Sequence, residues 1–137
     1  MSENSPQGSY EAYVIENPSI DPPNQGLYIS KTGTGEFRLV ANLPEDIESA
    51  QKLYWTEDGT RAIFVTNWHL FITDVQNFST RKISLNPDWW TWQQGRKTFS
   101  SSGTSVVMEQ LEFIGSDSLR YRTNLMTQPV VVTLTDL

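Results

Sequence analysis

The sequence predicts an all-β fold built as a stack of small antiparallel sheets. Short segments rich in aromatic and β-branched residues alternate with turns of glycine, proline, asparagine and aspartate along the 137 residues. One strand–turn–strand segment recurs 43 positions further along the chain. Helical periodicity is nearly absent, so paired strands have to form the core.

The first part of the chain is expected to hold one strand and one loop. Residues 1–9, MSENSPQGS, are polar and predict a disordered tail, and residues 10–137 are long enough for one all-β domain. Residues 10–17 alternate between an apolar and a mixed face, as a partly buried strand does. Residues 17–26 contain three prolines and a glycine and predict a loop.

Four hairpins and a last strand are expected after this loop. The hairpins are residues 27–43 around Gly33-Thr34-Gly35, 52–67 around Glu57-Asp58-Gly59, 69–85, and 106–124 around Gly115-Ser116-Asp117. An Asp-Gly pair suits a turn that needs positive φ. Residues 129–137, rich in valine and threonine, predict the last strand, and residues 43–53 predict a single helical turn or a loop.

The repeat is visible without gaps. When LYISKTGTGEFRLV is placed over LFITDVQNFSTRKI, Leu27 falls on Leu70 and Arg38 on Arg81. The segments LYWTEDGTRAIFVTN and LEFIGSDSLRYRTN share a further pattern, an aromatic strand, an acidic turn and a second strand that ends in Thr-Asn. A repeat of about 43 residues with four strands is typical of propeller blades.

Residues 53–85 resemble one complete repeat of a TolB-type β-propeller. Asp58-Gly59, Thr66-Asn67, Asp74 and Arg81 stand at the positions that the family pattern uses, and residues 10–43 and 108–137 look like partial copies. The resemblance implies about three blade-like repeats, whereas a closed propeller needs four to eight. The expected fold is therefore a propeller-like stack of small antiparallel sheets, not necessarily a closed ring, with a β-sandwich or barrel as the alternative.

The composition disfavours several classes of function. Ten Lys and Arg stand against 16 Asp and Glu, for a net charge of −6, and an acidic surface repels nucleic acid. No segment has the 18 or more apolar residues of a membrane helix, and no cofactor motif is present. The chain has no cysteine, which fits a reducing compartment and predicts a cytoplasmic location. A removed export signal would leave the same sequence.

The tryptophan cluster of DWWTWQQGRK is the candidate binding site. Trp90 and Trp92 are alternate residues, so in a strand they share one face and Trp89 takes the other. Two indoles about 7 Å apart can stack on sugar rings or on a partner's proline or arginine. Gln93 and Arg96 add polar contacts. The alternative interpretation is that these indoles fill the space between sheets.

No catalytic motif stands out, and we expect a non-enzymatic domain. His69 is the single histidine, and the turns account for Asp58 and Asp117. The expected function is binding of a protein or peptide, or self-association as a homo-oligomer, by edge-strand pairing and burial of the Trp90 and Trp92 face. Two alternatives are a carbohydrate-binding module that uses the same indoles and a small hydrolase that uses Asp88 or Glu112.

Overall fold

Three antiparallel sheets and one separate hairpin make up the fold. The computed structural model describes residues 2–15, 26–42, 50–85, 90–93, 96–99, 106–115 and 117–134. The first sheet contains β1 (Ser2–Asn4), β2 (Tyr10–Ile15), β3 (Gly26–Lys31) and β4 (Phe37–Asn42), and the central sheet contains β5 (Ala50–Trp55), β6 (Arg61–Thr66), β7 (His69–Asp74) and β8 (Ser79–Ser84). The third sheet contains β11 (Met108–Ile114), β12 (Ser118–Thr123) and β13 (Val130–Thr133), and the hairpin contains β9 (Trp90–Gln93) and β10 (Arg96–Phe99).

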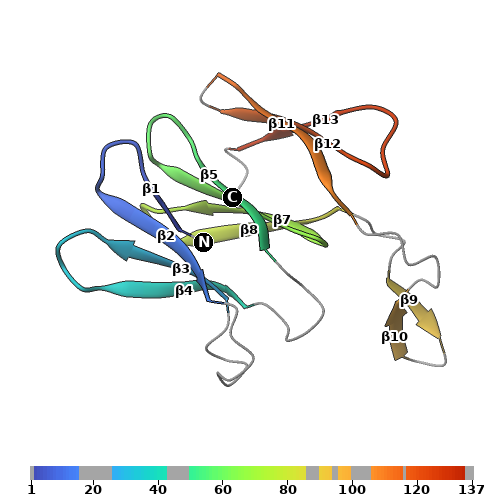
Figure 1. The fold of residues 1–137 in the computed structure, drawn as a ribbon, viewed down its shortest axis with the longest axis horizontal. Helices are drawn as coiled ribbons and strands as arrows, with labels where there is room; N and C mark the ends of the chain where they lie inside the picture. Colours follow the sequence, from blue (N-terminus) through green and yellow to red (C-terminus); the bar gives the residue numbers. More distant parts are fainter. Residues whose placement is uncertain are drawn as a thin grey trace.

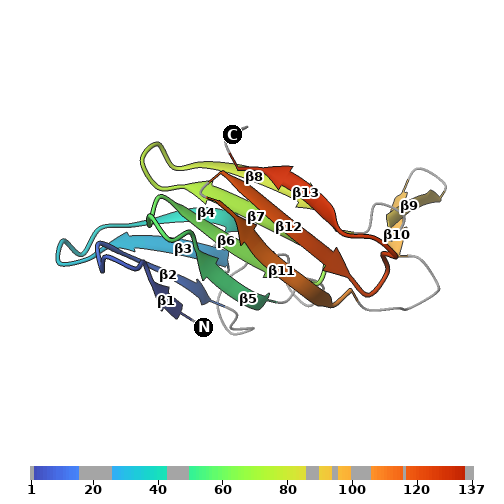
Figure 2. The same ribbon diagram turned by 90° about the horizontal axis from the view of Figure 1, so that it is seen from above.

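The three sheets are stacked face to face, which confirms the predicted propeller-like arrangement of small antiparallel sheets. Figure 1 shows them as successive blue, green and orange layers, and Figure 2 looks onto the third sheet where it covers the central one. None of the sheets closes on itself, and the part of the chain that the structure describes contains strands and turns but no helix.

The central sheet is buried on both faces. In β6, Ala62 and Phe64 pack with the first sheet, whereas Ile63 and Val65 pack with the third. Successive side chains of a strand point to opposite faces, so both alternating sets of β6 have to be apolar. Each face of the central sheet therefore supplies one half of a separate hydrophobic core.

A recurring backbone hydrogen bond shows that the sheets are structural repeats. The amide that follows the third strand of the repeat donates to the carbonyl that precedes the second strand. The three bonds are Thr32 N to Ser9 O at 2.9 Å, Val75 N to Thr60 O at 3.0 Å, and Leu134 N to Asp117 O at 2.7 Å. The sequence repeat therefore corresponds to a repeated strand-and-turn geometry.

Residues 2–9 belong to the first sheet, where the sequence predicted a disordered tail. Residues Ser2–Asn4 form strand β1, which pairs with β2. The turn that follows matches the Asp58-Gly59 turn: Ser5 N donates to Tyr10 O at 2.8 Å, and Thr56 N donates to Arg61 O at 2.9 Å. The polar composition did not predict this strand, because backbone pairing does not need apolar side chains. A side-chain hydrogen bond also holds the strand, since the Trp55 indole N–H donates to Glu3 O at 2.9 Å.

The Thr-Asn pattern has a structural role in two sheets. Thr66 and Thr123 are both fully buried. The Thr66 hydroxyl accepts hydrogen bonds from the amides of Trp68 and His69, at 3.1 and 2.9 Å, and the Thr123 hydroxyl accepts from Leu125 N at 3.3 Å. The threonine thus satisfies the backbone where the second strand of the repeat ends.

The expected hairpins and the last strand are present, but one strand begins earlier than the sequence predicted. The four turns join β3 to β4, β5 to β6, β7 to β8 and β11 to β12. Strand β5 begins at Ala50, inside the segment 43–53 that predicted a helical turn or loop. Residues 43–49 and most of the predicted 17–26 loop lie outside the described residues.

Phe64→Ala should lower the free energy of unfolding by about 3–5 kcal/mol, because the ring is fully buried between two sheets. The measurement is urea unfolding followed by tryptophan fluorescence. Phe37→Ala is the control, since Phe37 is 62% exposed and its loss should cost less than about 1 kcal/mol. Equal losses for the two variants would contradict the burial pattern.

Asp58→Asn should flatten the dependence of stability on acid pH. Hydrogen bonds from Thr56 and Thr60 and the nearby Arg61 hold the pKa of Asp58 below its ordinary value of 3.8. The carboxylate therefore stabilises the fold above that pH, and the contribution is lost as the pH falls through the lower folded value. Urea unfolding between about pH 5 and 2 measures this, and Glu57→Gln removes a charge from the same turn as a control. A variant with the wild-type slope would refute the role of Asp58.

Candidate functional site

The outer face of the first sheet carries an aromatic surface. We call it the aromatic face and define it as Tyr13, Tyr28, Phe37 and Leu39. Tyr13 lies opposite Tyr28, and Tyr28 lies opposite Leu39. The two tyrosine rings stack with centroids 5.5 Å apart, and Phe37 meets Tyr28 edge-on at 5.9 Å. Phe37 and Leu39 are 62% and 40% exposed, so this surface is only partly covered by the protein itself.

The same aromatic pair occurs in the central sheet, where it is buried. Phe64 lies opposite Phe71, as Tyr13 lies opposite Tyr28, and the two phenylalanine rings stack at 5.9 Å. That pair packs against Ala12 and neighbouring residues of the first sheet. The aromatic face is therefore the side of the repeat that the central sheet uses to contact the sheet before it.

The third sheet uses the equivalent side in the same way. Tyr121 stands two residues before Thr123, as Phe64 stands two residues before Thr66, and it lies opposite Val130. Tyr121 is buried in the core shared with the central sheet. Two of the three sheets thus bury this side of the repeat against a preceding sheet. In the first sheet, Tyr28 is buried at 7% exposed, whereas Phe37 and Leu39 on the same side stay exposed.

The outer face of the third sheet is charged instead. Arg120 pairs with Glu112, and Arg122 pairs with Glu109 at 2.9 Å. The amide of Gln110 donates to Glu112 Oε1 at 3.0 Å. A polar outer face is what terminal repeats of stacked proteins present to water. The two ends of the stack therefore differ: the third sheet carries two Arg–Glu pairs beside the exposed Val131 and Ile114, and the first sheet ends in aromatic rings.

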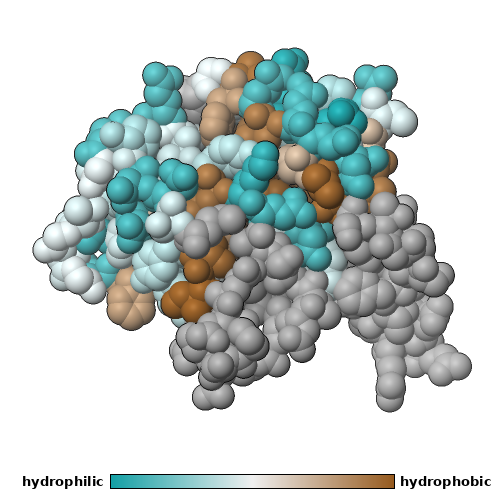
Figure 3. Space-filling view, in the orientation of Figure 1, coloured by the Kyte–Doolittle hydropathy of each residue, from teal (hydrophilic) through white to brown (hydrophobic). Residues whose placement is uncertain are grey.

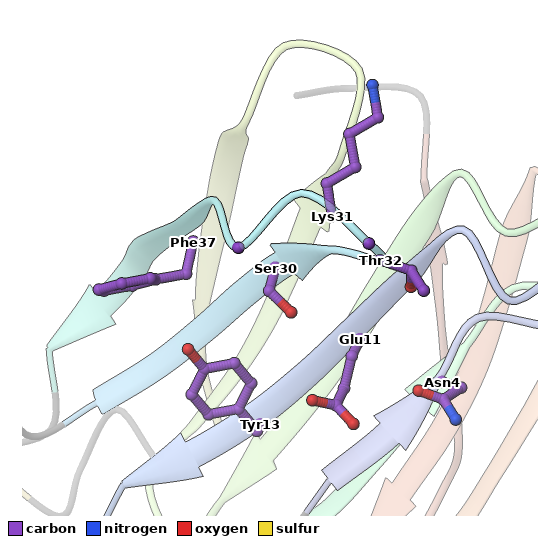
Figure 4. A pocket seen from close by; sticks show the side chains of 9 residues that line it. Asn4, Glu11, Tyr13, Ser30, Lys31, Thr32 and Phe37 are labelled. Carbon is purple, nitrogen blue, oxygen red and sulfur yellow. The ribbon is translucent and has the colours of Figure 1, made fainter.

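A pocket of about 410 Å³ lies beside the aromatic face. Figure 4 shows its lining, with Glu11 and Tyr13 from β2, Ser30 from β3 and Phe37 from β4. The β3–β4 turn closes one side, and its glycines have positive φ, 81° at Gly33 and 72° at Gly35. The remaining lining residues are Asn4, Lys31 and Thr32.

The pocket combines a carboxylate with aromatic rings. Burial raises the pKa of Tyr13 above its ordinary value, and Tyr28 and the negative charge of Glu11 raise it further. Among the residues that the structure describes, no ion pair involves Glu11. Lys31 lines the pocket, but its side chain extends away from the Glu11 carboxylate in Figure 4. The site is therefore suited to a ligand with both apolar surface and positive charge.

The tryptophan site stays a prediction. Trp89 lies outside the described residues, and of Trp90, Trp92, Gln93 and Arg96 the structure describes the backbone only. β9 pairs with β10, with Trp92 opposite Lys97. Figures 1 and 2 both place this hairpin to one side of the three stacked sheets and apart from them. The structure thus does not bring the hairpin onto the aromatic face.

The residues considered for catalysis are placed as follows. Asp88 lies outside the described residues, and Glu112 is held by Arg120 on the exposed face of the third sheet. His69 lies in β7, and its ring centroid is 5.6 Å from that of Phe71. In the described part of the chain, no group of three or more His, Cys, Asp or Glu could hold a metal ion.

The aromatic face was not predicted from the sequence. Its signal was nevertheless present, because Tyr28 aligns with Phe71 in the 43-residue repeat. What the alignment did not give was the order of the stack, which decides that one pair is buried and the other faces outward. Figure 3 shows the side seen in Figure 1, where apolar atoms emerge among hydrophilic ones over the described sheets.

Comparison with known proteins adds no family assignment. No protein-family model matches the chain, and a search of curated proteins found no match. Within the described ranges, no helix is long and apolar enough to cross a membrane.

Glu11→Gln should lower the pKa of Tyr13 toward its ordinary value, because one of the charges that raise it is removed. Burial, the larger cause, remains, so the pKa should stay above that of a free tyrosine. NMR titration with ring-labelled tyrosine measures the change, and Tyr13→Phe assigns the resonance. Glu57→Gln on the β5–β6 turn is the charge-matched control. A Tyr13 titration that does not respond to Glu11→Gln would contradict the pocket geometry.

Proposed function

We propose that the chain is an open, propeller-type repeat domain that acts by binding another protein through the aromatic face. The observation that carries the proposal is the equivalence of the Tyr13–Tyr28 pair with the buried Phe64–Phe71 pair. The side of the repeat that packs against a sheet elsewhere in the molecule carries exposed apolar side chains in the first sheet, Phe37 and Leu39, beside the buried Tyr28. A partner with an apolar surface would complete the same contact.

Aromatic anchors suit such a contact energetically. Burial of apolar surface contributes about 25 cal/mol per Å², and exposed aromatic residues are frequent sites of high binding energy. Phe37 is the most exposed of the large apolar side chains that the structure describes, at 62%. The edge strands β1 and β4 flank the face and offer main-chain groups to an added strand.

The charge distribution favours a different protein over a second copy of this chain. Two copies that met through the aromatic face would bring together two molecules that each have a net charge of −6. A head-to-tail contact would instead desolvate the Arg120–Glu112 and Arg122–Glu109 pairs, and the loss of water around such charges is costly. We therefore propose a partner that is apolar at its centre and basic at its rim.

The proposal includes membership of the TolB-type propeller family. Support comes from residues 53–85, which carry the family pattern and lie in the four-stranded central sheet β5–β8. Further support is that Gly59 of the Asp58-Gly59 turn has positive φ and that Thr66 of the Thr-Asn pair is fully buried. The predicted tryptophan contacts of β9 belong to the same function as a second binding surface.

Phe37→Asp should weaken binding of the partner by about tenfold or more, because a charge replaces the most exposed anchor of the aromatic face. The partner is captured by cross-linking, purified, and titrated against each variant by calorimetry. Val131→Asp is the control, since Val131 is 57% exposed on the outer face of the third sheet and should change affinity less than about threefold.

Two results would contradict this proposal. A purified partner that binds Phe37→Asp as tightly as the wild type would show that the aromatic face is not the interface. Light scattering that gives a multiple of 15.6 kDa, lost in Phe37→Asp, would show that a second copy covers the face.

A further inference from the structure

We infer that the pocket beside the aromatic face receives an arginine side chain of the bound protein. This inference rests on the proposed function and names the chemistry of the partner. It starts from a juxtaposition of three groups: the Glu11 carboxylate and the Tyr13 and Phe37 rings line one pocket.

The pocket offers the two kinds of contact that a guanidinium makes. A carboxylate accepts two parallel hydrogen bonds from the planar fork of arginine. The face of an aromatic ring attracts a cation that lies within about 6 Å of its centre. Ser30 and Asn4 add neutral polar groups to the lining of the pocket. Arginine matches this set better than lysine, because its plane can stack on a ring and pair with a carboxylate at once.

The molecule already uses such contacts between its own sheets. The Arg38 guanidinium lies 4.6 Å from the centre of the Phe78 ring. Arg38 lies opposite Ile29 on the inner side of the first sheet, and Phe78 packs in the core between the first and central sheets. An arginine over a ring is therefore part of the sheet-to-sheet contact that the aromatic face would repeat with a partner.

The charges around the pocket favour a cation. The net charge of −6 attracts basic segments toward the protein. Among the described residues Glu11 has no ion-pair partner, and the one lysine that lines the pocket extends away from it in Figure 4. A bound arginine would neutralise the Glu11 carboxylate in a partly desolvated site, where such a pair is stronger than in water.

The test uses N-acetyl-arginine methylamide, with the citrulline analogue as the uncharged isostere. Two-dimensional NMR of the full chain should show saturable shifts for Tyr13 and Phe37 with the arginine probe and none with citrulline. Glu11→Gln should weaken binding by about tenfold, the factor that loss of a charge-assisted pair gives. Phe37→Leu keeps an apolar side chain but removes the ring and should weaken binding by a smaller factor.

The controls separate this inference from the proposed function. Glu57→Gln removes the same charge elsewhere and should bind the arginine probe as the wild type does. Equal shifts with citrulline, or unchanged affinity in Glu11→Gln, would overturn the arginine assignment. If the arginine assignment failed but Phe37→Asp still weakened binding of the purified partner, the aromatic face would remain the proposed interface. Only the arginine ligand of the pocket would then be refuted. If the arginine probe bound but Phe37→Asp left partner binding intact, the pocket would stand and the proposed interface would fall.

Discussion

The burial of β6 and β7 on both faces is the constraint on which the rest of the structure depends. Their side chains belong to two hydrophobic cores, one on each face of the central sheet. Removal of the first or the third sheet would therefore expose one apolar face of the central sheet to water. Side-chain hydrogen bonds also link the central sheet to the third. The Gln51 amide donates to Val106 O at 2.6 Å, and the Arg81 guanidinium donates to Thr133 O at 3.1 Å.

The equivalence of the three sheets explains why the same aromatic pair lies in the core in one sheet and on the outer face in another. Phe64 and Tyr13 occupy the same place in the repeat, and their partners Phe71 and Tyr28 lie directly opposite them. The difference between the pairs lies in their neighbours and not in their own geometry. Tyrosine in place of phenylalanine suits this difference, because its hydroxyl can remain in contact with water while the ring packs.

Much of the fold was predictable from the sequence, because strand alternation and glycine turns are local signals. The turns at Gly33, Gly59 and Gly115 were found from composition, and each glycine has positive φ. Strand β1 was missed because its residues, Ser-Glu-Asn, carry no apolar alternation and are held by backbone pairing. The aromatic face was missed for another reason: it depends on which sheet has a neighbour, and that is a property of the tertiary arrangement.

The contrast between the two ends of the stack gives the molecule a direction. An additional sheet placed ahead of the first one would meet stacked rings in the geometry that its own repeat is built to cover. The same sheet placed after the third would meet Arg120 and Arg122 already neutralised by glutamates. Duplication of the repeat, in evolution or by engineering, is therefore favoured on the side of the first sheet, and on the other side it costs the desolvation of two ion pairs.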